Sequence, residues 1–233
     1  MEHHIFLWVD HIPGLSLLPG HIATSLIVSV ALILFAYMAK RQLAAADDVA
    51  VPDDSLTCRN MAELLTQGIS DMAEGVLGDR AQKYVHLYGS FFLFILIANL
   101  SGLLPGFSPP TSDFNVTLAL GVLSFVAYNF YAFQEQGLAY LKHFVGPIWW
   151  LGILMVPLEL IDNFVRPFSL SLRLFGNMTG DHVVLEIFTD LTKVVIPVVF
   201  YALGAFVSLV QAFVFTLLSM VYVSLAVAHD EHH

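Results

Sequence analysis

The chain has 233 residues, of which 58% are hydrophobic and only 12% are charged, and its mean hydropathy is +0.77. Soluble domains carry about 25% charged residues, so this composition excludes an ordinary soluble domain and requires that lipid solvates most of the chain. The formal net charge of −10 comes from acidic residues spread over loops, membrane segments and the tail, so it indicates no nucleic-acid partner. We therefore expect one membrane domain over 1–233, an all-α integral membrane protein with about five transmembrane helices and one amphipathic surface helix.

The first predicted span covers residues 19–39 and is followed at once by Lys40 and Arg41, the basic pair that marks a cytoplasmic end. The N-terminus lacks the basic start of a secretory signal, so we expect this span to be permanent and the N-terminus to lie outside. Residues 57–78 repeat apolar side chains at helical spacing, with polar side chains on the other face. This pattern predicts an amphipathic helix on the cytoplasmic surface of the membrane, although a soluble helix packed on a partner would give the same pattern.

Two further spans are predicted at 84–104 and 114–134, joined by an external turn that contains Pro109 and Pro110. Counting Lys and Arg on this topology supports the orientation, because basic residues gather on the cytoplasmic side of membrane proteins. The cytoplasmic set is Lys40, Arg41, Arg59, Arg80, Lys83 and Lys142, against Lys193 outside. With five spans, the C-terminus is cytoplasmic.

The last two predicted spans, 148–189 and 194–229, are too long to cross a bilayer upright. The uncharged run at 194–229 would extend about 54 Å as a helix, whereas the hydrocarbon core is about 30 Å thick. We therefore expect a long, strongly tilted hairpin that packs on protein or has segments emerging into water. Folding it at about 190–191 would place Arg173 opposite Ser208 and Gln211.

Ionisable side chains at membrane depth are costly and normally mark an ion pathway, and the 148–189 span contains several. At about 100° per residue, Glu159, Arg166, Ser169 and Asn177 lie within about 40° of Arg173 around the helix. Nearer the outer end the polar side chains change sides, because His182 lies about 180° and Glu186 about 220° from Arg173. One polar stripe on each half of the membrane, with a permanent cation between them, is typical of two offset half-channels.

Structural roles remain open for several of these residues. Glu159, with Asp162 and Arg166, would also suit an ion-pair cluster at a membrane end, and Ser208 and Gln211 would also suit interhelical hydrogen bonds. His182 would also suit a buried core histidine. Arg173 is harder to explain structurally, because arginine stays protonated and no acidic residue lies one turn away.

Three segments resemble the a subunit of F-type ATP synthases. Residues 166–182 read RPFSLSLRLFGNMTGDH and are similar to the family's signature segment, while NLSGLLPG at 99–106 and PTSDFNVT at 110–117 are similar to its second and third spans. Gln211 stands where the family has the glutamine of its last helix. The likeness extends over almost the whole chain from the first span onward.

This resemblance implies a non-catalytic stator subunit in a bacterial plasma (inner) membrane, which conducts protons and binds no cofactor and no metal. Its implied partners are membrane lipid, a rotating c-ring, subunit b of the peripheral stalk and the remainder of the complex. Arg173 matches the family's essential arginine. Asn177, His182 and Gln211 match positions of the external half-channel, and Glu159 and Ser169 lie on the cytoplasmic side. The chain departs from the family at Gly204, where an ionisable partner for the residue at the His182 position is expected. We therefore expect Glu186 to take that part, with Asp181, or water held near Gly204, as the next candidate.

Two other classes of protein share part of this pattern. A secondary transporter would use intramembrane charges to bind an ion or solute, but the chain shows no repeated halves and no matched pair of broken helices. A membrane metalloenzyme is suggested by the ten histidines, but these are mostly terminal, and the chain has no H-E-x-x-H motif and no cysteine pair.

Overall fold

The computed structural model describes residues 18–45, 57–104, 106–137, 140, 152–192 and 195–227. Every regular element within these ranges is helical, which confirms the predicted all-α class. The elements are α1 (Gly20–Ala44), α2 (Cys58–Leu77), η2 (Gly78–Arg80), α3 (Ala81–Ser101), η3 (Pro110–Ser112), α4 (Phe114–Gln136), α6 (Gly152–Leu191) and α7 (Val195–Val227).

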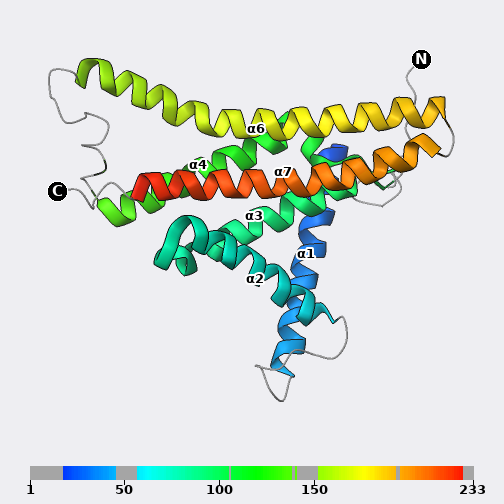
Figure 1. The fold of residues 1–233 in the computed structure, drawn as a ribbon, viewed down its shortest axis with the longest axis horizontal. Helices are drawn as coiled ribbons and strands as arrows, with labels where there is room; N and C mark the ends of the chain where they lie inside the picture. Colours follow the sequence, from blue (N-terminus) through cyan, green and yellow to red (C-terminus); the bar gives the residue numbers. More distant parts are fainter. Residues whose placement is uncertain are drawn as a thin grey trace.

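The two longest helices, α6 and α7, form an antiparallel hairpin along the long axis of the molecule, as Figure 1 shows. Helices α3 and α4 pack against this hairpin, α3 mainly on α7 and α4 on both of its arms. Helix α1 extends away from the hairpin and packs instead on α2, α3 and η3 (Figure 1). The hairpin is therefore supported on one side by α3 and α4, and it has no contact with most of α1.

Within the part of the chain that the structure describes, four helical segments are long and apolar enough to cross a membrane: α1, α3, α4 and residues Pro197–Val227 of α7. Helix α6 is not among them, and it is the helix that carries Glu159, Arg173 and Glu186. Its 40 residues would extend about 60 Å. That length is twice the thickness of a bilayer core of about 30 Å, so the polar helix and its apolar partner α7 cannot both stand upright in a membrane.

The helices begin and end close to the predicted spans, with two differences. Helix α1 continues past the predicted end at residue 39 through Lys40 to Ala44, because these residues favour helix and a charged turn can extend beyond the apolar core. Helix α3 lies three residues earlier than the predicted 84–104 and ends at Ser101. Residues 102–104 form a turn there, in which Gly102 packs directly against the ring of Pro109.

Contacts at the two ends of the spans indicate how the helices alternate in direction. At one end, Nδ1 of His21 at the start of α1 lies 3.4 Å from the carboxylate of Asp113, which precedes α4. At the other end, Lys83 at the start of α3 forms an ion pair with Glu135 at the end of α4. The start of α1 thus lies on the side of the α3–α4 connection, as the predicted topology requires.

Helix α2 has the amphipathic character expected of it. The Thr57 hydroxyl caps its first turn by accepting a hydrogen bond from the backbone N–H of Asn60 at 3.3 Å, and it ends at Gly78, whose φ of +58° favours glycine. Its apolar face, with Ile69 and Ala73 buried, packs on α3 and α7 of the same chain. The chain's own helices therefore cover part of the apolar face of α2.

Candidate functional site

Helix α6 remains one continuous helix although it contains Pro157 and Pro167. Proline lacks the backbone N–H that would bond to the carbonyl four residues earlier, so Pro167 leaves the carbonyl of Asn163 without its helical donor. The Tyr128 hydroxyl of α4 donates a hydrogen bond to this carbonyl at 3.3 Å, and Tyr128 is buried. A side chain of α4 thereby satisfies the polar group that the proline exposes.

A second contact brings α4 and α6 unusually close. A Cβ atom at Gly121 of α4 would lie 2.6 Å from the backbone oxygen of Pro167 and 2.2 Å from Oγ of Ser171. Glycine at 121 therefore allows the two helices to touch backbone to backbone. This contact with α4 holds α6 in place at Ser171, two residues before Arg173.

Arg173 itself lies on the exposed side of α6. Among the described residues its guanidinium has no hydrogen bond and no ion pair. Gly176 and Gly180 follow on the same side, and a Cβ atom at either would meet no atom of the described chain within 4 Å. The structure thus places a permanent cation on an open helix face with small residues beside it.

Polar side chains meet between the two arms of the hairpin one turn after Arg173. Nδ2 of Asn177 donates a hydrogen bond to Oε1 of Gln211 at 2.7 Å. Gln211 is 3% exposed and Ser208 is fully buried; within the described chain, Nε2 of Gln211 and Oγ of Ser208 have no hydrogen-bond partner. The glutamine therefore binds Asn177, rather than the arginine that we expected it to meet.

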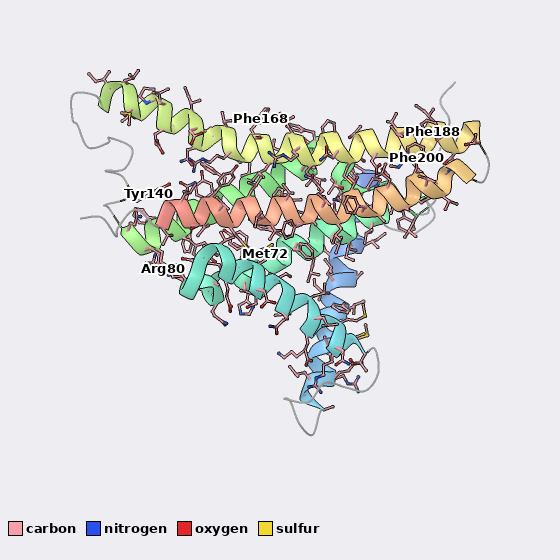
Figure 2. The ribbon with its side chains drawn as sticks, viewed as in Figure 1. Met72, Arg80, Tyr140, Phe168, Phe188 and Phe200 are labelled. Atoms are coloured by element: carbon pink, nitrogen blue, oxygen red, sulfur yellow. The ribbon has the colours of Figure 1, made fainter. Side chains whose placement is uncertain are left out.

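The reason is the register of the hairpin. Helix α6 runs on to Leu191 and α7 begins at Val195, so the chain turns later than the expected 190–191. The rings of Phe188 and Phe200 stack across this closed end with centroids 4.4 Å apart, and Figure 2 shows the two side by side. The later turn pairs Gln211 with Asn177 and moves Arg173 opposite a part of α7 beyond Gln211.

Beyond Asn177, the side chain that meets Gly204 of α7 is that of Asp181. A Cβ atom at Gly204 would lie 2.7 Å from Oδ2 of Asp181 and 2.8 Å from Leu103. Neither His182 nor Glu186 has a hydrogen bond or ion pair within the described chain, and Glu186 is exposed. The structure therefore shows no bond between His182 and Glu186, whereas it places the Asp181 carboxylate against the α7 glycine.

The polar stripe on the other side of Arg173 contains an ion pair. Arg166 donates from Nε to the Asp162 carboxylate at 3.1 Å, and its guanidinium lies 5.3 Å from the ring centroid of Tyr222 in α7. Glu159 lies two turns before Arg166 and is half-buried, and Ser169 is exposed one turn before Arg173. The predicted Asp162–Arg166 pair is thus present, and the stripe continues from it to Arg173.

Asp181, which the sequence offers only as the next candidate after Glu186, is the carboxylate that contacts Gly204. One further group was not identified from the sequence. Thr216 of α7 is fully buried, with its hydroxyl unpaired within the described chain, and it follows Gln211 on the inner side of α7. The described residues contain no group of three His, Cys, Asp or Glu side chains placed to hold a metal ion.

Comparison with known proteins gives a consistent result. The family described as "ATP synthase A chain" matches residues 22–224. The protein named "ATP synthase subunit a" from Bdellovibrio bacteriovorus is 44% identical over 226 residues, which cover 97% of this chain and 99% of the relative. Proteins of the same name from Geobacter sulfurreducens and Sorangium cellulosum are 44% and 38% identical, over 73% and 90% of this chain and 76% and 82% of their own lengths.

Proposed function

The chain belongs to the ATP synthase A chain family, and from this premise we propose that Arg173 separates two offset proton half-channels that open on opposite sides of the membrane. As a member of this family the chain is an integral membrane, non-catalytic subunit of an ATP synthase complex, and it serves proton transport and ATP synthesis. Family membership also favours this role over that of a secondary transporter.

The proposed partner of Arg173 is a carboxylate on a rotating ring of c subunits. The observation that carries the proposal is the exposed, unpaired guanidinium of Arg173 on the part of the chain that the structure describes. Gly176 and Gly180 support it, because small residues let a neighbouring helix approach closely. We propose that the peripheral stalk, through subunit b, holds the chain still while the ring turns.

The external half-channel is proposed to run between α6 and α7 toward Arg173. Buried polar groups without protein partners support this route, because such groups normally bind water; they include Oγ of Ser208 and Nε2 of Gln211. The acidic and basic side chains nearer the α6–α7 turn would deliver protons to this half-channel. The proposed set is Asn177, His182, Glu186, Ser208 and Gln211, to which the contact with Gly204 adds Asp181.

The cytoplasmic half-channel is proposed to follow the other stripe of α6, from Ser169 to Glu159. Ser169 is exposed one turn from Arg173, and Glu159 lies about 21 Å from Arg173 along the helix axis. Both positions support this route. The ion pair between Asp162 and Arg166 lies along the same stripe and leaves Arg173 as the unpaired cation.

A proton from outside would neutralise a ring carboxylate, which can then face lipid at low cost. When a protonated carboxylate reaches Arg173, the fixed positive charge favours its ionised form, so the proton leaves by the cytoplasmic stripe. The same charge repels a proton that would pass directly between the half-channels. One proton gains about 2.3 kcal/mol per 100 mV, so rotation must couple several protons to each ATP.

The orientation is proposed with the N-terminus outside a bacterial inner membrane and the C-terminus in the cytoplasm. The supporting observation is that Lys40 and Arg41 lie near the end of α1, and that Arg59, Arg80 and Lys83 lie on the elements that follow directly. Basic residues that follow a span mark its cytoplasmic end, so the rule assigns the end of α1 to the cytoplasm.

The experiment that tests the role of Arg173 is ATP-driven proton pumping in inverted membrane vesicles. Arg173→Ala should abolish pumping while the complex still assembles and hydrolyses ATP. Arg173→Lys should fail nearly as badly, because lysine is a point charge that can lose its proton. Arg41→Ala, at the exposed end of α1, is the matched control and should pump at the parent rate. Pumping by either Arg173 variant at that rate would refute the proposed role.

A further inference from the structure

A groove opens between α1, α2 and α3. Its volume is about 540 Å³, and apolar side chains make up most of its wall, among them Ile33 and Ala36 of α1 and Leu93 of α3. Helix α1 packs on α2, α3 and η3, and side chains of α1, α2 and α3 together line the groove.

The few hydroxyl groups in the wall of this groove are satisfied by their own helices. Oγ of Ser29 donates to the carbonyl of Ser25 at 2.8 Å, Oγ1 of Thr66 to that of Ala62 at 2.7 Å, and Oγ of Ser90 to that of His86 at 2.8 Å. Water in the groove would find few free partners there. Because α1 and α3 are apolar enough to span the membrane, hydrocarbon is the natural content of the groove.

At one end the groove continues into a polar recess of about 620 Å³, and both share the side chains of Thr66 and His86. Lys40 lines this recess, is exposed and has no ion pair within the described chain. Arg59 lies beside it and is held by Glu63, whose carboxylate accepts from Nε at 2.7 Å. Among the described residues that line it, the recess therefore has one positive charge without a partner, next to the apolar groove.

We propose that this groove and recess bind one phospholipid, with an acyl chain along α1 and α3 and the headgroup phosphate at Lys40. The combination of an apolar slot and a basic mouth at the end of a span matches the chemistry of an anionic phospholipid. A transmembrane helix of another protein fits less well, since one helical turn alone takes up about 400 Å³. The groove thus has room for little more than one turn of a span that needs about six.

The test uses the purified, assembled complex in vesicles of phosphatidylcholine that contain a photoactivatable phosphatidylglycerol. Illumination should attach this lipid to α1 or α3, at positions that mass spectrometry of the digested subunit identifies. Ala36→Trp, which fills the groove from its exposed side, should nearly abolish the labelling. Ala31→Trp is the matched control, because Ala31 is exposed on α1 outside the groove, and it should label as the parent does.

The headgroup contact is tested with Lys40→Gln, paired with Arg41→Gln as the neighbouring exposed cation outside the recess. Labelling should fall roughly fivefold for Lys40→Gln, the loss expected for one basic residue at a membrane surface, and stay unchanged for Arg41→Gln. Equal labelling of the parent and Ala36→Trp would overturn the proposal, as would equal losses for Lys40→Gln and Arg41→Gln. A density map with a partner helix seated in the groove would also overturn it.

Discussion

The hydrogen bond from Tyr128 to the carbonyl of Asn163 should be worth more than most hydrogen bonds between membrane helices. Such bonds contribute about 0.6 kcal/mol on average and up to about 1.7 kcal/mol, because a helix freed from its neighbour finds other partners. The Asn163 carbonyl has no such alternative, since Pro167 has removed its helical donor. Tyr128→Phe should therefore cost about 1–2 kcal/mol, the lower part of the range for an unsatisfied buried group.

This cost can be measured as the temperature at which the subunit is lost from the purified complex in mild detergent. A change of 1 kcal/mol shifts the midpoint of a chain of this size by about 2–4 °C, so Tyr128→Phe should lower it by about 2–8 °C. Proton pumping at lower temperature should survive, since Tyr128 has no part in the proposed proton path.

Tyr88→Phe is the matched control for this measurement. Tyr88 of α3 is as deeply buried as Tyr128, but its hydroxyl has no partner within the described chain. Removing an unpaired buried hydroxyl should leave the midpoint unchanged or raise it. The reasoning is refuted if Tyr128→Phe keeps the parent midpoint, or if Tyr88→Phe lowers it by as much.

Two further predictions concern the external route and the orientation. His182→Ala, Glu186→Gln and Asp181→Asn should each slow ATP-driven pumping strongly. The double variant of His182 and Glu186 should be little worse than either single variant, because the two residues serve one path. If Glu186→Gln pumps at the parent rate while Asp181→Asn is slow, the carboxylate that delivers protons with His182 is Asp181 rather than Glu186. A cysteine placed at residue 3 should react with an impermeant thiol reagent from outside intact cells, and one at residue 231 only after permeabilisation, whereas the opposite labelling would invert the half-channels.

Much of the fold follows from local sequence patterns. Charge-free runs longer than a bilayer core predict long apolar helices, because hydrocarbon admits little else, and α1, α3, α4 and α7 are such helices. The length of the last two segments also predicted the hairpin. Its register could not be predicted in the same way, because it depends on contacts between helices, such as Phe188 on Phe200, that leave no periodic signal in either helix.

In the site, too, local patterns predict some features, whereas others depend on contacts between helices. Arg173 is prominent in the sequence because an unpaired arginine in an apolar segment is costly, and the structure leaves it exposed. Asp181, which contacts Gly204, is only the second choice after Glu186 from the sequence, because angular spacing on one helix does not say which side chain the opposite helix meets. The hydrogen bond from Tyr128 to the Asn163 carbonyl likewise cannot be predicted from the sequence, although Pro167 indicates that this carbonyl needs a donor from outside the helix.

A density map of the assembled complex would test most directly the claim that Arg173 faces the rotating ring. The account predicts a ring helix packed along the face of α6 that carries Arg173, Gly176 and Gly180, with a carboxylate at the level of the guanidinium. It also predicts hydrated paths that reach this point from opposite sides of the membrane. A map in which that face meets lipid or a stalk helix, with the ring elsewhere, would contradict it.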